Sequence, residues 1–379
     1  MRIERIELRE VGLPLVHPFE TSFGRETERR VIIVTAFGEG LVGYGESAAG
    51  LGPWYSYETV ETCWHVQRDF LVPLMVGQDI ETPTEVTERF APVRGHNMAK
   101  TGLEEAVWDL FAKKAGEPLA RFLGGERERI ESGVSVGIQP TVDALLDRIG
   151  RFLDQGYCRI KIKIKPGWDI DVVKAVRQTF PDARLMLDAN SAYSLDDASS
   201  LAALDAFDLM MIEQPLGYYD LLDHARLQAM IETALCLDES IITPEHARWA
   251  IELESCRIIN IKPARVGGLH QAKRIHDLCQ EHGLAVWCGG LLETGIGRAH
   301  NVALSTLPNF RLPGDISESA RYYEEDLVDP PFTLNPDGTI SVPTGPGIGV
   351  AVDKDRLDAC TIRSQTFEVK RDGRVESLR

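Results

Sequence analysis

The chain has 379 residues, with 41 Lys and Arg against 58 Asp and Glu, so its net charge at pH 7 is −17. This charge argues against nucleic-acid binding, because no basic stripe is present to neutralise phosphates. No apolar run is long enough to span a bilayer, and the opening MRIERIELREVGL lacks the continuous apolar stretch of a signal peptide. Seven cysteines without a CxxC pair suit a reducing compartment. We therefore expect a cytoplasmic protein that binds neither membranes nor nucleic acids.

The first 125 residues predict an α+β module. Apolar and polar residues alternate in three segments typical of strands, at 3–11, 30–37 and 41–46, with the last two joined as a hairpin. A helical pattern follows over 57–74. The residues Thr101-Gly-Leu-Glu104 then form a capping-box pattern ahead of a helix that is expected to end near Gly116.

Residues 126–320 repeat a strand and a helix about every 25 residues. Short apolar runs predict eight buried parallel strands, at 133–137, 159–163, 184–188, 209–213, 234–238, 257–262, 284–288 and 309–313. Helical patterns lie between them at 171–180, 195–204, 220–231, 244–253 and 270–282. This alternation predicts a β/α barrel. The remaining segment, 321–379, is rich in Pro, Gly and short β-like stretches, and we expect it to return to the first module.

Five polar residues end successive barrel strands at an almost constant spacing. They are Lys163, Asp188, Glu213, Asp238 and Lys262, separated by 25, 25, 25 and 24 residues. Equal spacing in a repeated β/α unit places each residue at the same structural point, the carboxyl end of its strand. Because barrel enzymes keep their chemistry at that end, we expect the five side chains to converge on the barrel mouth.

The three acids predict a metal site. Without a cation, the carboxylates of Asp188, Glu213 and Asp238 would repel one another at the barrel mouth. Oxygen donors without His or Cys favour Mg²⁺ over Zn²⁺, with Mn²⁺ as a substitute. An ion held by three protein oxygens keeps positions open for water and for a substrate carboxylate. Each acid taken alone is equally typical of a helix N-cap, and the equal spacing of all three favours the metal site.

The lysines predict acid–base chemistry. Lys161, Lys163 and Lys165 alternate with isoleucines and would share one face of a strand, which in isolation is typical of a solvent-exposed basic face. At a barrel mouth, the charge of Lys161 would favour the neutral amine that Lys163 needs as a general base, and Lys161 would help to hold a substrate carboxylate. Lys262 lies across the barrel and is interpreted as a second acid/base, or else as a salt-bridge partner of the acids.

The motifs around these residues resemble the enolase superfamily, in its muconate-lactonizing subgroup. The matching strings are KIKIKPGWD at 161–169, LDANSAY at 187–193, MIEQPL at 211–216, LCLDES at 235–240 and NIKPARVGG at 260–268. The resemblance covers nearly the whole chain, from the first strand to about Gly349. It implies an α/β fold with a modified TIM barrel, (β/α)7β, under an α+β capping domain built from both chain termini.

Within that subgroup the chain is most similar to o-succinylbenzoate synthases that also racemise N-acylamino acids. Strings that point there include HPFETSFG at 17–24, WCGGLLETGIGRAHN at 287–301 and LPGDISES at 312–319. The resemblance implies Lys163 and Lys262 as the acid/base pair and Asp188, Glu213 and Asp238 as Mg²⁺ ligands. It further implies substrate contacts at Ser135, Lys161 and Asn190, a side-chain pocket at Gly290, Leu291 and Leu292, and a residue that tunes Lys262 at Arg265.

Two of these positions carry alternatives. The family more often has methionine where this chain has Leu291, which leaves the chemistry untouched and bears on the preferred size of the N-acyl amino acid. Arg265 is otherwise interpreted as a surface arginine at a strand end.

The implied reactions begin with removal of the proton α to a carboxylate. In the synthase reaction Lys163 would take this proton and help to expel hydroxide from the same face, while Lys262 stabilises the intermediate. In the racemase reaction the two lysines would act on opposite faces of one carbon. The resemblance fits either reaction or both, in menaquinone synthesis or in amino-acid conversion, and relatives suggest a homo-oligomer, either a dimer or an octamer.

Two other functions use the same residues. A dipeptide epimerase would need the same five residues, and the capping-loop strings argue mildly against it. A catalytically silent barrel that binds a metal–carboxylate ligand has no need of bases on both faces of that ligand.

Substrate specificity is expected to come from two N-terminal loops. Their apolar candidates to cover the barrel mouth are Phe19, Phe23 and Tyr55, with Leu51 and Trp54 beside them. The same side chains are also typical of an ordinary core in a closely packed capping domain.

Overall fold

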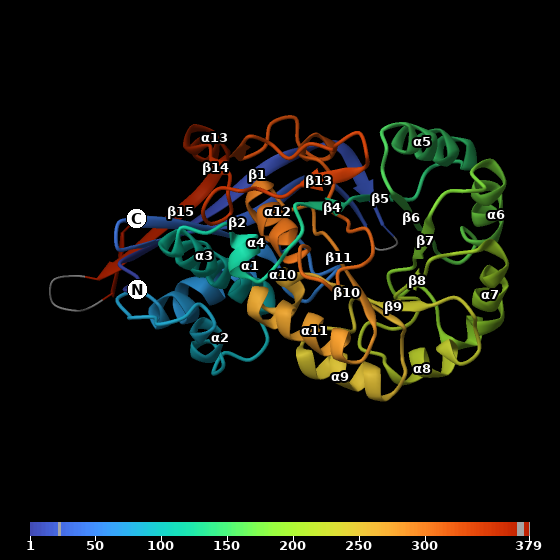
Figure 1. Cartoon of the computed structure of the whole chain (residues 1–379), viewed down its shortest axis with the longest axis horizontal. Helices are drawn as coiled ribbons and strands as arrows, with labels where there is room; N and C mark the ends of the chain where they lie inside the picture. The colour runs from blue at the N-terminus through green and yellow to red at the C-terminus, as the bar shows by residue number, and fades with distance from the viewer. Residues whose placement is uncertain (22–23, 370–374, 379) are drawn as a thin grey trace.

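The computed structural model describes residues 1–21, 24–369 and 375–378. Its two parts are an antiparallel sheet with helices packed on it and a curled parallel sheet ringed by helices (Figure 1). Among the described residues, no helix combines the length and the apolar character needed to cross a bilayer.

The antiparallel sheet joins both ends of the chain. Its order is β16-β15-β1-β2-β3, with bounds Arg5–Glu20 for β1, Arg25–Gly38 for β2, Leu41–Ser47 for β3, Thr361–Val369 for β15 and Val375–Leu378 for β16. Alternate residues of β1, such as Ile6 and Leu8, are buried against the helices, as expected for a sheet with one covered face. Shorter elements between these parts are α2 (Glu85–Arg89), α4 (Leu119–Phe122), β4 (Arg129–Glu131), η5 (Ser319–Arg321), β12 (Val328–Asp329), β13 (Thr339–Ser341), β14 (Ala351–Val352) and α13 (Lys354–Cys360).

The long helix α3, Asn97–Ala115, lies directly on strand β3. Two glycines of β3 make this contact possible: a Cβ added to Gly43 would lie 2.1 Å from the carbonyl oxygen of Ala106, and one added to Gly45 would lie 2.2 Å from that of Gly102. Only glycine tolerates so close an approach of a helix backbone to a strand.

The predicted capping box at Thr101 was wrong. Thr101 lies inside α3, where its hydroxyl donates to the Asn97 carbonyl at 2.8 Å. The helix start is capped instead by Glu58, which accepts from the backbone N–H groups of Met98 and Ala99 at 2.9 and 3.1 Å. A cap supplied from 40 residues away leaves no local sequence signal. The helix ends at Gly116 with φ of 71°, as predicted.

The first predicted helix, 57–74, is divided. It consists of α1 (Val60–Val66), a π-helical turn η1 (Gln67–Leu71) and a 3₁₀ turn η2 (Val72–Leu74). Pro73 is the second residue of the 3₁₀ turn. Proline has no N–H group and so cannot donate a hydrogen bond that would continue an α-helix.

The parallel sheet confirms the predicted barrel strands in order, β5 to β11. Their bounds are Gly133–Val136, Arg159–Lys163, Leu185–Asp188, Ile212–Glu213, Leu235–Leu237, Ile258–Ile261 and Ala285–Cys288, and each pairs in parallel with the next. The outer helices and turns are α5 (Val142–Asp154), α6 (Ile170–Thr179), η3 (Leu195–Asp197), α7 (Ala198–Ala202), η4 (Ala203–Phe207), α8 (Leu222–Gln228), α9 (Pro244–Glu252), α10 (Pro263–Val266), α11 (Leu269–Glu281) and α12 (Gly295–Leu304). Of these, α5, α10 and α12 had no predicted counterpart.

The eighth predicted strand, 309–313, is not a regular strand. Instead, Phe310 makes an isolated parallel bridge to Val286 in β11, and Gly314, just after the predicted run, makes one to Ser132 beside β5. Pro313 interrupts the segment and has no N–H to donate to a ladder. The seven-stranded sheet is therefore closed by an irregular segment, which carries Asp315 to the barrel mouth.

Two buried glutamates of the capping part hold the barrel helices beneath it. Glu46 on β3 accepts from the backbone N–H of Gly297 at 3.0 Å and from the hydroxyl of Thr294 at 2.6 Å, at the start of α12. Glu104 on α3 accepts from Leu269 N–H at 2.8 Å, at the start of α11. The carboxyl oxygens thus accept hydrogen bonds from N–H groups at the helix N-termini that have no partner within the helix.

The stability of this junction is expected to depend on pH through Glu46. Burial, opposed by the hydrogen bonds from Thr294, raises the pKa of Glu46 from 4.5 to about 8. A raised carboxyl pKa in the folded state favours folding most below pH 4.5, and this contribution is lost as pH rises from 4.5 to about 8. In urea unfolding of wild type and Glu46→Gln between pH 4 and 9, the free energy of unfolding of wild type should fall relative to the variant by a few kcal/mol. A difference that is constant over this range would contradict the assignment.

Candidate active site

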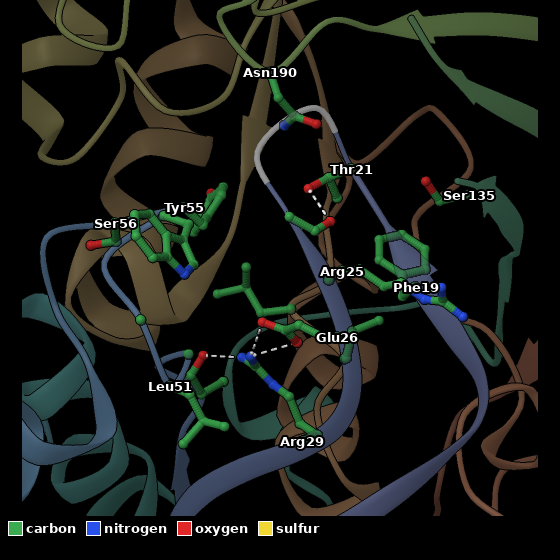
Figure 2. A pocket seen from close by; sticks show the side chains of 18 of the residues that line it. Phe19, Thr21, Arg25, Glu26, Arg29, Leu51, Tyr55, Ser56, Ser135 and Asn190 are labelled. Atoms are coloured by element: carbon green, nitrogen blue, oxygen red, sulfur yellow. Dashed lines mark hydrogen bonds and ion pairs between the residues drawn. The ribbon is translucent and has the colours of Figure 1, made fainter. Parts of the chain in front are cut away.

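A cavity of about 320 Å³ lies between the capping sheet and the mouth of the barrel. Figure 2 shows Phe19 and Arg25, from the β1–β2 hairpin, on the same side of the cavity as Ser135, with Tyr55, from the loop after β3, on the opposite side and Asn190 between them at the top of the view. The barrel floor of the same cavity is formed by Lys161, Lys163, Lys262, Asp315 and the loop Gly290 to Leu292.

The regularly spaced residues occupy neighbouring strand ends. Lys163 pairs in register with Asp188 across β6 and β7, and Asp188 pairs with Glu213 across β7 and β8. Asp238 and Lys262 directly follow β9 and β10. All five residues are buried, with no more than 6% of any of them exposed. The five residues that are about 25 positions apart in the sequence thus form one contiguous polar surface inside an apolar barrel.

The first lysine group surrounds Asp188. The ammonium of Lys163 lies 2.7 Å from Asp188 Oδ2 and donates to Asn190 Oδ1 at 2.6 Å. Lys161 lies 3.2 Å from the same Asp188 oxygen, 3.0 Å from Glu213 Oε2 and 2.5 Å from Asp315 Oδ2. Both ammonium groups therefore contact carboxylates that are themselves buried.

The prediction that Lys165 lies on the same strand face as Lys161 and Lys163 was wrong. Strand β6 ends at Lys163, and Lys165 is exposed in a turn that bridges it to Trp168. Only the first two lysines of the KIKIK run reach the cavity, because the strand geometry that places alternate residues on one face stops there.

The second lysine group surrounds Asp238. Lys262 Nζ lies 2.7 Å from Asp238 Oδ2 and donates to Tyr55 Oη at 3.0 Å. The Tyr55 hydroxyl donates in turn to Asp238 Oδ1 at 2.9 Å. Arg265 is buried and not at the surface: its guanidinium forms an ion pair with Asp238 and donates to Tyr55 Oη at 3.3 Å and to the Ile241 carbonyl at 2.8 Å. A capping-part residue thus contacts the second barrel lysine.

Burial and charge shift the titration of these groups in opposite directions. Burial disfavours the ionised form of Asp188, yet Lys163 and Lys161 outweigh it and hold the Asp188 pKa below its usual range. Burial, followed by the charge of Asp188, raises the pKa of Glu213. Burial also disfavours the charged form of Lys161, but Asp315, Glu213 and Asp188 together raise its pKa. The neighbouring charges thus favour ionised Asp188 and Lys161, whereas burial and the charge of Asp188 disfavour ionised Glu213.

The backbone after β7 and β8 takes left-handed conformations. Asn190 and Gln214, which are not glycines, have φ values of 43° and 38°. Gln214 compensates with its side chain, which accepts from the Asp238 N–H at 3.0 Å and donates to Ser240 Oγ at 2.7 Å. Strain of this kind is characteristic of functional sites and requires the surrounding structure to hold it.

The carboxylate oxygens of Asp188, Glu213 and Asp238 are ligands of the type that a hard divalent cation prefers. As the side chains stand, no group of three or more His, Cys, Asp or Glu side chains within residues 1–21, 24–369 and 375–378 is arranged to hold a metal ion. The oxygens of Asp188, Glu213 and Asp238 are instead bound by ammonium and guanidinium groups. The three donors are all carboxylates, come from adjacent strand ends and are at most 1% exposed, a donor set that suits Mg²⁺. The ammonium groups of the lysines and the guanidinium of Arg265 supply the countercharge in this structure.

Three polar residues of the cluster had no predicted role. Asp315 binds Lys161 and also forms an ion pair with Arg159 at 2.7 Å. Glu239 accepts from Asn190 Nδ2 at 2.9 Å, and burial, followed by the charge of Asp188, raises its pKa to about 7. Asn260 donates to Glu213 Oε1 at 2.6 Å. The strings LPGDISES, LCLDES and NIKPARVGG contain these residues. The family motifs could therefore have identified them, whereas the 25-residue spacing of the strand ends could not.

The predicted substrate and specificity residues that the structure describes line the cavity, apart from Arg265, which lies behind Tyr55 and Asp238. The lining of the cavity includes Ser135, Lys161, Asn190, Gly290, Leu291, Leu292, Phe19 and Tyr55. Phe23 lies outside the described residues. Leu51 and Trp54 also line the cavity and are 54% and 68% exposed, so they are not core residues. The hydroxyl oxygen of Ser135 is buried without a hydrogen-bond partner in the described structure, facing this space.

Comparison with known proteins agrees with this layout. Residues 4–124 match the mandelate racemase / muconate lactonizing enzyme N-terminal domain, and residues 144–356 match the enolase C-terminal domain-like family. The chain is 54% identical to the o-succinylbenzoate synthase of Geobacillus kaustophilus, over 97% of this chain and 98% of that protein. It is 50% identical to the N-succinylamino acid racemase of Thermus thermophilus, over 96% and 98%.

Two further comparisons are with an epimerase and with a solved structure. The L-Ala-D/L-Glu epimerase of Bacillus subtilis is 28% identical, over 92% of this chain and 97% of that one. A solved structure of an enolase-superfamily protein from Listeria innocua superposes with a TM-score of 0.94 at 44% identity, covering 97% and 99% of the two chains. The chain therefore belongs to the enolase superfamily and, within it, to the family of o-succinylbenzoate synthases and N-succinylamino acid racemases.

Proposed function

We propose that this protein removes the proton α to a substrate carboxylate with the help of a divalent metal ion, and that it catalyses both o-succinylbenzoate synthesis by dehydration and racemisation of N-succinylamino acids. The observation that carries the proposal is the pair of buried lysines, Lys163 and Lys262. They line one cavity from strand ends on either side of Asp188, Glu213 and Asp238. Relatives about half identical to this chain carry the names of both activities.

The difficulty of the reaction is electrostatic. Removing an α-proton places a second negative charge next to a carboxylate, and sites of this superfamily answer it with a basic side chain and one or two Mg²⁺ ions. Asp188, Glu213 and Asp238 are the residues that would hold the ion. Bound there, Mg²⁺ would act as a Lewis acid on the substrate carboxylate and lower the cost of the developing charge. Lys161, which stays charged among three carboxylates, supports the same charge from the floor of the cavity.

The lysines divide the proton transfers. In dehydration, Lys163 takes the α-proton and returns it to the departing hydroxide on the same face, so one base is sufficient. In racemisation, the proton leaves from one face of the carbon and returns to the other, so Lys163 and Lys262 exchange the roles of base and acid between the two enantiomers. Asn190 accepts from Lys163, and Tyr55 accepts from Lys262, which orients each amine.

Arg265 acts as a positioning residue for the second lysine. It contacts Asp238 and Tyr55, the two groups that bind Lys262. Its fixed positive charge thereby competes with Lys262 for the same carboxylate, which would adjust how readily Lys262 gives up its proton.

The test follows both reactions with one enzyme preparation. Enzyme with Mg²⁺ in D₂O is mixed with N-succinyl-L-phenylalanine, and α-proton exchange and loss of optical rotation are followed by proton NMR and polarimetry, with the dehydration substrate assayed in parallel. EDTA is expected to reduce both rates by at least about 10²- to 10³-fold, the size of a lost preorganised electrostatic contact. Added Mg²⁺ or Mn²⁺ should restore them. Rates that are indifferent to EDTA would contradict the proposed metal dependence.

The same experiment separates the alternative activities. Exchange with racemisation establishes the two-base reaction, and dehydration alone assigns a dedicated synthase. Activity on neither substrate would favour dipeptide epimerisation, which uses the same proton chemistry and is the named activity of a more distant relative.

A further inference from the structure

Five basic residues gather in a cleft beside the active-site cavity. They come from four elements: His17 on β1, Arg25 on β2, Arg148 and Arg151 on α5, and Arg321 at the end of η5. The cleft consists of two adjoining cavities of about 240 and 220 Å³, which share His17, Arg148 and Arg321 in their linings. It therefore bridges the capping sheet and the barrel.

The four arginines of this cleft are not paired with any acidic residue that the structure describes. Among the described residues, no ion pair is formed by Arg25, Arg148, Arg151 or Arg321. The chain nevertheless carries 58 Asp and Glu and has a net charge of −17. Two carboxylates, Glu20 and Glu318, also line the cleft, yet neither is paired with these arginines. Four unpaired arginines around one cleft are unexpected in so acidic a protein.

Arg321 is the most confined member of the group. It is only 8% exposed, and its Nε has no hydrogen-bond partner within the described structure. Its Nη2 donates to the Ser135 carbonyl at 3.4 Å, and its guanidinium lies 5.1 and 5.2 Å from the rings of Phe152 and Tyr322. The aromatic rings hold the guanidinium in place but do not neutralise it.

The cluster is electrostatically costly as it stands. Burial, followed by the charges of Arg321 and Arg151, lowers the pKa of Arg148. Burial, followed by the charges of Arg148, Arg321 and Arg151, lowers the pKa of His17. Mutual repulsion of this kind is relieved when an anion binds between the cations.

We infer that this cleft is a binding site for a small oxyanion with more than one negative charge, of the phosphate or dicarboxylate class. Arginine presents planar N–H forks that bind such groups in pairs, and unpaired guanidinium groups from two sides of a cleft match a group with several acceptor oxygens. The linings of the cleft do not include Lys163 or Lys262, but Phe19 and Arg25 line both this cleft and the active-site cavity. A bound anion would tie β1 and β2 to α5 and η5 and so fix the hairpin beside the mouth of the active site.

Isothermal titration calorimetry of the metal-free full-length protein tests this site at constant ionic strength. The probes are inorganic phosphate and, separately, succinate. Wild type should bind at least one of them, and the double variant Arg148→Gln, Arg151→Gln should bind it about tenfold or more weakly, because two charge-assisted contacts are lost. Arg226→Gln on α8, where the arginine is 68% exposed, removes a positive charge elsewhere and should bind as wild type does.

Each outcome decides the inference. Phosphate binding that depends on the two arginines assigns a phosphate-type ligand, and succinate binding alone assigns a dicarboxylate. Binding that is unchanged in the double variant, or absent for both probes, overturns the site. If light scattering then shows that the double variant has changed its oligomeric state, the arginines contact a second copy of the chain instead. Because the readout is binding without metal, the result does not depend on the proposed catalytic function.

Discussion

Replacing Lys163 with alanine is expected to abolish dehydration and racemisation together, with a loss in kcat of about 10⁴-fold, the upper range for a general acid–base group. In the proposed mechanism both reactions use Lys163, whose amine lies 2.6 Å from Asn190 Oδ1 and 2.7 Å from Asp188 Oδ2 and lines the cavity. Steady-state rates with each substrate and α-proton exchange in D₂O measure the effect.

The matched control is Lys165→Ala, two residues along the same run. Lys165 is exposed and outside the cavity, so its loss should leave both reactions unchanged. Because Lys262 remains on the other face, exchange of the α-proton of one enantiomer should persist in Lys163→Ala without racemisation. A Lys163→Ala protein that still dehydrates, or still exchanges the α-proton of both enantiomers, at the wild-type rate would show that another group is the base.

Replacing Lys262 with arginine is expected to lower racemisation by about 10³-fold or more while dehydration persists at a reduced rate. Arginine keeps the positive charge beside Asp238 and Tyr55 but cannot give up a proton at working pH, because its pKa lies above about 12. One base then remains, on the face served by Lys163. The variant should therefore exchange the α-proton of one enantiomer in D₂O without losing optical rotation.

That partial reaction also shows that the variant is folded. Lys273→Arg on α11, where the lysine is 36% exposed and paired with Asp277, is the matched control and should behave as wild type. Racemisation at the full rate in Lys262→Arg would rule out the two-base division of labour. Loss of exchange for both enantiomers would instead assign Lys262 an essential electrostatic role in each.

Much of the polar surface at the barrel mouth was predictable because it depends on local periodicity. Parallel strands with nearly constant connections repeat the same structural point every 25 residues or so, and the five spaced residues mark that point. The fold class followed from the same alternation of short apolar runs and helical patterns. These inferences needed only chain geometry and the tendency of polar groups at strand ends to face the barrel mouth.

Other features depended on residues far apart in the chain. Helix α3 starts at Asn97 because Glu58 caps it, and the barrel closes through a segment interrupted by Pro313. Asp315 reaches Lys161 only through that closing segment, and Tyr55 reaches Lys262 only because the capping part lies over the barrel. No periodic pattern encodes such contacts, since each is a meeting of two segments that only packing brings together.

The sequence by itself therefore determined which acids and lysines stand at the ends of the barrel strands, because strand periodicity and connection length set their phase. The tertiary structure alone decided which of these charges touch, that Lys165 is left in solvent while Lys161 is enclosed, and that arginines from three elements, without an ion pair among the described residues, meet in one cleft. The physical reason is that Coulomb energy and desolvation depend on distance and burial in space, and neither is fixed by separation along the chain.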